Sequence, residues 1–404
     1  MWLLCTVIVR RLRIYYKGSE TMSQDRRNFI KATVLAGTVG VLSGGPGAAG
    51  LGQAARAATG RGSDKVSMHQ DGTYDVVPLS KNSVRLGVVQ SRVRGVRIDH
   101  WKKDRKANLA HMLELIDNAF HFGAGADILF FHEFPITGWN SWTREEILRF
   151  AIEIPGDETE AVARKAKEYG CYIVFGSYAR DDDWPNHVLS ITTIIGPDGE
   201  LVDKHWKARN IKGVFPGFEL FTTTIYDVMD EYVERYGADA ILPVTRTPYG
   251  NIATSSIQLE PELFRAFAMK GAEIMLRTAS GGFSPWDIKA TAAYNQVYVA
   301  ICNNAVSPDN PGFYDDAGSG GCAIYDPRGN VMAEADTKFE TLVSGVIPIA
   351  QFRTRNRQPI VHMELYREVF NTYRNAYGTN LFSEYQPTDL KDAKAYLANK
   401  STWK

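Results

Sequence analysis

Hydrophobic and polar positions follow two distinct spacings along residues 83–350. Apolar, β-branched runs predict buried strands, whereas apolar residues three and four positions apart predict helices. The predicted strands cover 83–91, 126–134, 171–179, 187–195, 200–206, 250–257, 272–280 and 297–306. The predicted helices cover 105–123, 157–170, 261–271 and 284–296, and a hairpin is predicted over 321–335.

The two halves of this pattern resemble each other. Each half ends in an apolar strand, a Pro-x-Gly turn (197–199 and 327–329) and a second strand. The repeat predicts two αβ layers packed through their sheets, which is a four-layer αββα sandwich. A doubly wound Rossmann sheet is the alternative, and it is disfavoured because no G-x-G-x-x-G motif opens a predicted helix.

The segments that flank residues 83–350 differ from them in composition. Residues 59–82 are polar and Gly-rich, which predicts a linker. Residues 351–404 are predicted to form a C-terminal arm. Within this arm, the aromatic-rich segment 360–373 has amphipathic spacing and predicts a helix that packs against its own domain or a partner subunit.

Residues 1–58 contain the features of an export leader. Arg26 and Arg27 precede an apolar, Gly/Ala-rich stretch and a small-residue site at 55–57, which predicts export by the twin-arginine pathway to the periplasm or beyond. A basic, disordered N-terminus is the alternative. Met22 is a plausible start, so residues 1–21 are a possible over-called start. The apolar core is short and glycine-rich, so no stable membrane span is expected in the mature protein.

Composition excludes several classes of partner. The 404 residues carry a formal net charge of zero and no basic stripe, so nucleic acid is not an expected partner. Four scattered cysteines make no disulfide framework, and no C-x-x-C or i, i+4 histidine pair predicts a zinc site. A metal site of His132, Glu133 and His205 is disfavoured because neighbours in a strand point to opposite faces. We therefore expect neither a metal nor a cofactor.

Two charged residues follow predicted buried strands. Glu133 ends an apolar run, and a carboxylate there is costly unless it is paired or used, so it is a candidate general base. Lys207 follows the strand 200–206, where an ammonium group beside a carboxylate can stabilise a developing oxyanion. A structural carboxylate and a solvated surface lysine are the respective alternatives. The turn before Pro261 is where a nucleophile would lie, with backbone amides nearby to bind an oxyanion.

Four segments in this order resemble the nitrilase (carbon–nitrogen hydrolase) superfamily, and most closely its aliphatic amidase branch. They are HEFPITGW at 132–139, GPDGELVDKHWK at 196–207, PELFRAFAMKGAEIMLR with NQVYVAICNNA within 261–305, and GCAIYDPRGNVM at 321–332. The resemblance covers 83–350. It implies an αββα sandwich, dimers or higher oligomers, no cofactor, and hydrolysis of amides, nitriles or carbamoyl groups through a Glu-Lys-Cys triad.

By position, the resemblance makes Glu133 the base and Lys207 the oxyanion-stabilising lysine. The family's nucleophilic cysteine lies six residues before the proline of a Pro-Glu pair. Counting back from Pro261 gives Ser255, whereas counting forward along the strand gives Ile257, so the segment is two residues short and lacks cysteine. Ser255, or alternatively Ser256, is the candidate nucleophile.

The missing cysteine changes the expected chemistry. A thiol titrates near ~8.5 and readily yields a thiolate, whereas a serine hydroxyl is a weak nucleophile without a well-placed base. A plain exchange of cysteine for serine would lose most activity, but the shortened turn is compatible with a site rebuilt around serine or around direct attack by water. Cys302 and Cys322 lie in segments that match structural strands, where cysteine is a small hydrophobe by default.

We therefore expect hydrolysis of a small amide-type C–N bond, with an amide or nitrile as substrate and a homo-oligomer as the assembly. The alternatives are an inactive relative that binds a small ligand or a partner, and a nitrile hydration or lyase reaction in the same pocket. The family's second, assisting glutamate falls in the loop 179–183, which contains only aspartates. Candidate substrate-binding residues are Trp139, Tyr178, Asp181 and Glu260.

Overall fold

The computed structural model describes residues 66–210, 221–308, 310, 318–355 and 359–403, and in these residues two six-stranded sheets face each other. The first sheet has the order β12-β1-β2-β3-β4-β5 and the second β11-β10-β9-β8-β7-β6. The strands are β1 Val84–Gln90, β2 Ile128–Phe131, β3 Tyr172–Ala179, β4 Leu189–Ile195, β5 Leu201–Trp206, β6 Thr245–Thr247, β7 Gly250–Ser255, β8 Ile274–Thr278, β9 Tyr298–Cys302, β10 Ala323–Tyr325, β11 Val331–Glu334 and β12 Thr341–Ile347.

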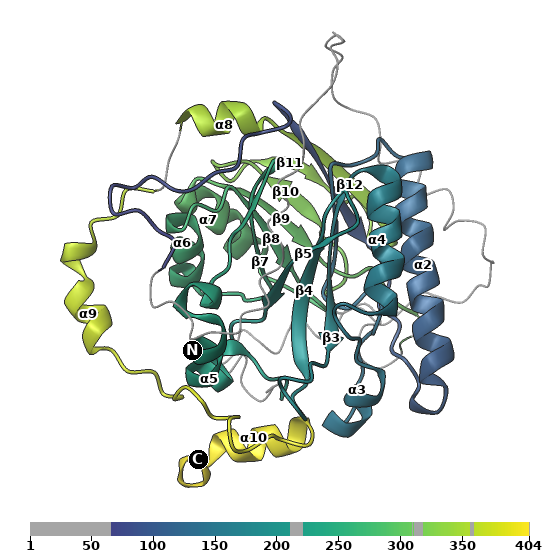
Figure 1. Cartoon of the computed structure of the whole chain (residues 1–404), viewed down its shortest axis with the longest axis vertical. Helices are drawn as coiled ribbons and strands as arrows, with labels where there is room; N and C mark the ends of the chain where they lie inside the picture. Colours follow the sequence, from purple (N-terminus) through teal and green to yellow (C-terminus); the bar gives the residue numbers. More distant parts are fainter. Residues whose placement is uncertain (1–65, 211–220, 309, 311–317, 356–358, 404) are drawn as a thin grey trace, which may run out of the picture.

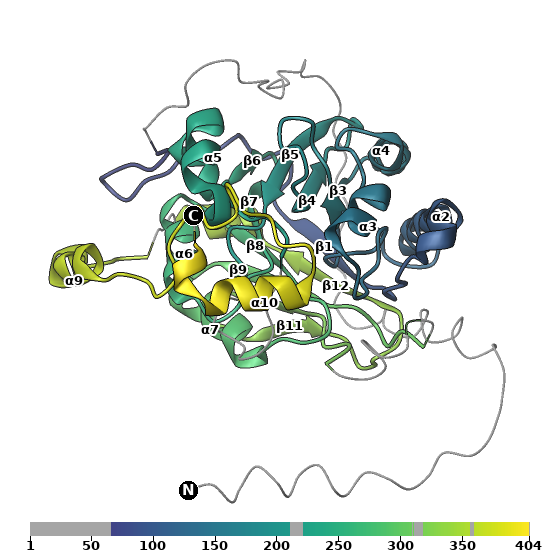
Figure 2. The same cartoon turned by 90° about the horizontal axis from the view of Figure 1, so that it is seen from below.

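Helices cover the outer face of each sheet. In both views α2 and α4 lie over the first sheet, and α6 and α7 lie over the second (Figures 1 and 2). The layers are therefore helix, sheet, sheet and helix, which confirms the predicted αββα sandwich. The helices are α2 Trp101–His121, α3 Arg144–Phe150, α4 Asp157–Tyr169, α5 Met229–Tyr236, α6 Pro261–Met269, α7 Pro285–Asn295, α8 Ile349–Arg355, α9 Arg367–Thr372 and α10 Leu390–Ala398.

The two sheets repeat one topology. Strands β1, β2 and β3 are parallel and are followed by the antiparallel pair β4 and β5. Strands β7, β8 and β9 are likewise parallel and are followed by the antiparallel pair β10 and β11. This is the internal repeat that the two Pro-x-Gly hairpins predicted. Each sheet gains one further antiparallel strand, β12 beside β1 and β6 beside β7.

Alternate residues of the first sheet pack on opposite sides. Ile128 and Phe130 of β2 belong to the core cluster between the sheets, whereas Leu129 and Phe131 belong to the cluster beneath α2 and α4. Because both faces of this strand are buried, its sequence is continuously apolar rather than alternating. The same alternation on β4 and β5 determines which side chains face the second sheet.

The C-terminal arm differs from its prediction. The single helix predicted over 360–373 is wrong: the segment forms a short 3-10 turn, Met363–Leu365, and the two-turn helix α9. The side chains of Ile360, Leu365 and Tyr373 are largely exposed, so no buried face stabilises a longer helix. Figure 1 shows α9 standing away from the sandwich, with α10 returning to its lower edge.

The structure describes only part of the segment that precedes the sandwich, for which a leader and a linker were predicted. The leader and start predicted within residues 1–58 lie outside the described residues. Residues 66–82 contain no helix or strand and bond to the sandwich through Ser67 and Ser80. Among the residues that the structure describes, no helix is long and apolar enough to cross a membrane.

Candidate active site

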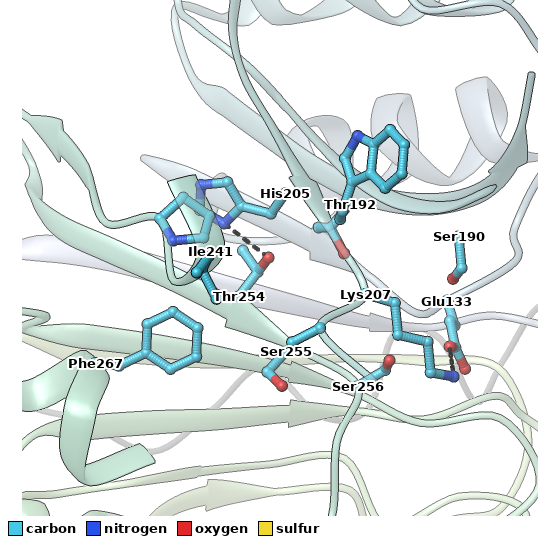
Figure 3. Close-up of a pocket in the computed structure, with 13 residues that line it drawn as sticks. Glu133, Ser190, Thr192, His205, Lys207, Ile241, Thr254, Ser255, Ser256 and Phe267 are labelled. Atoms are coloured by element: carbon cyan, nitrogen blue, oxygen red, sulfur yellow. Dashed lines mark hydrogen bonds and ion pairs between the residues drawn. The ribbon is translucent and has the colours of Figure 1, made fainter. Parts of the chain in front are cut away.

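A small cavity opens where β2, β5 and β7 end, between the two sheets (Figure 3). Strands β2 and β5 come from the first sheet and β7 from the second, so both sheets contribute to the wall of the cavity. Polar and charged side chains make up most of its wall. The lining residues are Glu133, Ser190, Thr192, His205, Trp206, Lys207, Ala208, Ile241, Pro243, Thr254, Ser255, Ser256 and Phe267.

Glu133 is held in place by a close approach of β3. The backbone N–H of Gly176 donates to the carbonyl oxygen of His132 at 3.1 Å. A Cβ atom at position 176 would lie 2.4 Å from the Glu133 carbonyl oxygen, so only glycine allows the two chains to lie this close. The Glu133 side chain then emerges from the end of β2, two residues beyond Phe131, toward the cavity.

Lys207 reaches the cavity through the alternation of β5. Trp206 points to the helix side, where it packs against Trp184 and Tyr232, so Asp203, His205 and Lys207 point to the other sheet. The Lys207 Nζ atom donates to Glu133 Oε1 at 3.1 Å. The side chains of Lys207 and Glu133 are only 9% and 10% exposed, so little solvent screens the pair. The structure thus brings together the two charged residues that the sequence singled out.

Three consecutive hydroxyl groups, Thr254, Ser255 and Ser256, lie at the end of β7 and line the cavity. The Ser255 Oγ atom accepts a hydrogen bond from the Ile257 backbone N–H at 3.1 Å. In Figure 3 the Ser256 hydroxyl lies on the Lys207 side of the chain, and the Ser255 hydroxyl points the other way. This agrees with strand alternation, because Thr254, two positions before Ser256, contacts β5 of the first sheet.

A hydrogen-bonded network around His205 forms one wall. His205 Nδ1 is 2.9 Å from Thr254 Oγ1, and His205 Nε2 is 2.8 Å from Thr245 Oγ1 and 3.2 Å from Asp203 Oδ2. Thr245 also donates to Asp203 Oδ2 at 2.7 Å. Burial raises the pKa of Asp203, but the charge that His205 carries when it is protonated, together with its hydrogen bond, outweighs burial and lowers this pKa to about 2. Asp203 is therefore ionised at neutral pH.

The turn after Ser256 is fixed by two arginines. Arg209 forms an ion pair with Glu260 and donates to the Gln258 carbonyl oxygen at 3.1 Å. The buried Arg277 pairs with Asp287 at 2.7 Å and donates to the Ile257 carbonyl oxygen at 2.6 Å. Leu259 adopts a left-handed conformation with φ of 58°, which is uncommon for a residue with a branched side chain. The hydrogen bonds of the two arginines hold the turn in this shape.

The four expected substrate-binding residues lie elsewhere. Tyr178 is buried and stacks on Phe134 at 4.4 Å, and burial followed by the charge of Glu133 holds its pKa well above the ordinary value. Asp181 pairs with Lys204 at 3.5 Å, and Glu260 pairs with Arg209 as described. The carbonyl of buried Trp139 accepts from Asn310. None of the four is among the described residues that line the cavity.

The sequence interpretation missed the hydroxyl and apolar lining of the cavity. Ser190 and Thr192 of β4 face the cavity because Ile191 and Ile195 point to the helices. The alternation of polar and apolar residues in β4 could have predicted that Ser190 and Thr192 point to the same side of the sheet. Ile241, Pro243 and Phe267 come from segments distant in sequence, so no local pattern could place them here.

The cysteines of the described chain do not line this cavity. Cys171, Cys302 and Cys322 are fully buried. Burial raises the pKa of Cys171 to about 12, and burial together with a hydrogen bond to Cys322 raises the pKa of Cys302 well above its ordinary value. These are small core residues rather than reactive thiols. Across residues 66–403, gaps excepted, no three His, Cys, Asp or Glu side chains cluster as metal ligands.

Two helix-covered sheets with a buried carboxylate–ammonium pair at their strand ends define the class of a nitrilase-type αββα sandwich. The profile of the Carbon-nitrogen hydrolase family matches residues 85–357. The chain therefore belongs to the carbon–nitrogen hydrolase family, within the nitrilase superfamily.

Curated relatives agree with this assignment. Omega-amidase NIT2-B of Xenopus laevis is 28% identical over 284 residues, which cover 68% of this chain and 92% of the relative. The formamidase of Helicobacter acinonychis (strain Sheeba) is 26% identical over 264 residues, which cover 62% of this chain and 71% of the relative.

Solved structures share the fold. Nit3 of Saccharomyces cerevisiae, a member of branch 10 of the nitrilase superfamily, aligns with a TM-score of 0.51 at 18% identity, covering 74% of this chain and 100% of its own. The amidase from Nesterenkonia sp. aligns with a TM-score of 0.51 at 16% identity, covering 72% of this chain and 98% of its own. Another structure of that amidase, with a TM-score of 0.50 at 16% identity over 73% of this chain and 99% of its own, has the acetamide moiety of fluoroacetamide added covalently at its active site cysteine.

Proposed function

We propose that the protein hydrolyses a small, non-peptide amide, with Glu133 as base, Lys207 as oxyanion stabiliser and a serine in place of the usual cysteine. The observation that carries this proposal is the 3.1 Å contact between Lys207 Nζ and Glu133 Oε1 in a hydroxyl-lined cavity at the strand ends. A buried ion pair is weak support for stability, because desolvation offsets much of the attraction. Its place beside three hydroxyl groups favours a chemical role.

The lining favours a small, neutral amide as substrate. Ser190 and Thr192 can donate to or accept from an amide group, and Ile241 and Phe267 can contact a short apolar chain. The names of the relatives, omega-amidase and formamidase, point to the same class of substrate. A nitrile remains the nearest alternative substrate.

The geometry supports a two-step acyl transfer. A hydroxyl oxygen attacks the amide carbonyl carbon while its proton passes to Glu133, and Lys207 stabilises the negative charge on the carbonyl oxygen. The C–N bond breaks as ammonia leaves with the proton from Glu133. Water then hydrolyses the ester, which releases the acid and restores the hydroxyl group.

Ser255 and Ser256 are the two serine candidates for this role. Counting back from Pro261 favours Ser255, whereas strand alternation and the orientation in Figure 3 favour Ser256, whose hydroxyl lies on the Lys207 side of the chain. The Ser255 hydroxyl already accepts from the Ile257 N–H, a contact that orders the turn. We therefore prefer Ser256 of the two.

One observation supports a second candidate function. The turn before Pro261 lacks both the cysteine and two residues of the family pattern, so a protein that binds a small ligand without turning it over is the competing proposal. Retention of both Glu133 and Lys207, in mutual contact, favours catalysis over this alternative.

Ammonia release from small aliphatic amides, formamide, nitriles and N-carbamoyl compounds tests the proposal. Lys207→Ala and Glu133→Gln are each expected to lower kcat by about 10²–10³-fold or more, because each removes a group that acts in the transition state. Lys204→Ala is the matched control, since Lys204 lies on the same strand but pairs with Asp181. Turnover retained in either site variant would refute its role, and no release by the wild type would favour the binding protein.

A further inference from the structure

Thr254 has a partner that the two serines lack. Its Oγ1 atom is 2.9 Å from Nδ1 of His205, while no hydrogen bond among the described residues joins Ser255 or Ser256 to a carboxylate or an imidazole. A hydroxyl group becomes an effective nucleophile when an adjacent base accepts its proton. Of the three consecutive hydroxyls, Thr254 alone has such a base within hydrogen-bond distance in the described chain.

The hydrogen bonds of His205 determine which ring nitrogen can accept that proton. An ionised carboxylate only accepts hydrogen bonds, so Nε2, at 3.2 Å from Asp203 Oδ2, carries the ring proton. Thr245 donates its own hydroxyl proton to Asp203 and can therefore accept from the same Nε2–H at 2.8 Å. In the neutral ring Nδ1 is then left with its lone pair, and Thr254 donates to it.

This network shares the cavity with the Glu133–Lys207 pair. Asp203, His205 and Lys207 are alternate residues of one chain segment and point to the same side. Figure 3 shows the His205–Thr254 bond on one side of the cavity and the Lys207–Glu133 contact on the other. A substrate carbonyl in the cavity would therefore meet a hydroxyl with its base on one side and the ammonium group on the other.

We propose that Thr254 is the nucleophile of this cysteine-free site, with His205 as its general base and Asp203 as the positioning residue of the imidazole. The inference rests on the proposed amide hydrolysis, but in its first half it replaces the serine nucleophile by Thr254 and the base Glu133 by His205. It leaves Glu133 to activate the water of the second half.

The steps balance as follows. Thr254 Oγ1 forms a bond to the carbonyl carbon, and its proton moves to His205 Nδ1. The C–N bond then breaks, and His205 returns that proton to the departing nitrogen, so ammonia leaves and an ester of Thr254 remains. Water adds to the ester carbon as Glu133 takes one of its protons, the C–O bond to Thr254 breaks, and that proton passes from Glu133 to Thr254 as the acid departs.

The test is to trap the ester in the Glu133→Gln protein, whose second half should be blocked. After incubation with an amide that the wild type hydrolyses, mass spectrometry is expected to find one acyl group, and peptide mapping is expected to place it on Thr254. An acyl group on Ser255 or Ser256, or none while the wild type releases ammonia, would overturn the inference and leave the proposed hydrolysis standing. No ammonia from the wild type would instead refute the hydrolysis itself, and the inference with it.

Substitutions distinguish a catalytic hydroxyl from a packing contact. Thr254→Val, which keeps the shape, should lower kcat by about 10³-fold or more, whereas Thr254→Ser, which keeps the hydroxyl, should retain part of the activity. Thr278→Val is the matched control, because Thr278 is a buried threonine at the end of the neighbouring strand β8. Full activity in Thr254→Val would overturn the inference.

Asp203→Asn tests the positioning role. It should lower kcat by about 10²-fold or more with little change in KM, because the asparagine amide favours the wrong tautomer of His205. Nitrogen NMR of the His205 ring should find the proton on Nε2 in the wild type and on Nδ1 in Asp203→Asn. An unchanged kcat, or a wild-type proton on Nδ1, would contradict the assignment.

Discussion

Glu133 and Lys207 lie 74 positions apart in the sequence and 3.1 Å apart in the structure. The sequence alone marked each as a charged residue at the end of a buried strand, and the family motifs then assigned a role to each. Their contact was not predictable from local pattern, because it depends on how β2 and β5 lie in one sheet. The His205–Thr254 bond was even harder to predict from the sequence, because it joins two different sheets.

Glu340 gives a pH-dependent prediction at the residue scale. Burial raises its pKa, but the hydrogen bond and charge of His111 and the charge of Arg92 outweigh burial and lower this pKa to about 2. A carboxyl group with a depressed folded pKa stabilises the protein above its unfolded pKa of about 4.3, and this stabilisation is lost as the pH falls toward 2. Glu340→Gln should therefore lower the free energy of unfolding at pH 7 by about 2–3 kcal/mol.

Urea unfolding at several pH values measures this effect. The difference between wild type and Glu340→Gln should shrink once the pH falls below about 4. Glu114→Gln is the control, because Glu114 lies 3.9 Å from the same His111 but is 65% exposed. A difference that stays constant from pH 7 to pH 3, or an equal loss in the control, would contradict this account of Glu340.

At the scale of elements, Gly176 controls the distance between β3 and the segment that carries Glu133. An added Cβ would lie 2.4 Å from the Glu133 carbonyl oxygen and 2.7 Å from its Cα, and backbone atoms cannot yield as a flexible side chain can. Gly176→Ala should therefore displace Glu133, lower kcat by at least about tenfold and destabilise the protein by roughly 1–3 kcal/mol.

Activity and thermal unfolding of Gly176→Ala can be compared with those of Gly378→Ala. Gly378 has no heavy atom within 4 Å of an added Cβ, so its substitution should change neither quantity. Wild-type activity in a folded Gly176→Ala protein would show that the position of Glu133 does not depend on this contact.

The strands and helices of the sandwich were predictable because most have strong periodicity. Strands β1 to β5 and β7 to β11, and helices α2, α4, α6 and α7, lie where the sequence pattern predicted them. Strand β6 has only three residues, and β12 alternates around a glycine, so neither formed an apolar run. Helix α3 has a capping box, in which Thr143 and Glu146 bond reciprocally, but only seven residues. Short elements like these depend on their tertiary neighbours.

On the scale of the whole molecule, one arginine ties the start of the C-terminal arm to the core. Arg353 on α8 contacts both carboxylate oxygens of the fully buried Glu273 at 2.8 and 2.9 Å and donates to the Val77 carbonyl at 2.6 Å. It therefore joins three segments that are distant in sequence. The Asn251 backbone N–H also donates to Glu273, which connects this junction to β7.

Removing the Arg353 side chain should destabilise the protein. Arg353→Ala would leave the Glu273 carboxylate buried and without its charged partner, and we expect a loss of about 3 kcal/mol in the free energy of unfolding. Arg367→Ala is the control, because Arg367 forms an exposed pair with Glu364 on the arm and should change stability by less than about 0.5 kcal/mol. Equal, small effects of the two substitutions in chemical denaturation would contradict this role of Arg353.

The central claim is that this carbon–nitrogen hydrolase works without a cysteine nucleophile. Its most direct test is ammonia release by a protein in which Cys5, Cys171, Cys302 and Cys322 are all replaced by alanine, with single replacements alongside to identify any that impair folding. We predict kcat/KM within a few-fold of the wild type on the amide that the wild type hydrolyses best. Loss of turnover in a folded variant, above all in Cys322→Ala, would contradict this claim and indicate that a cysteine thiol is the nucleophile.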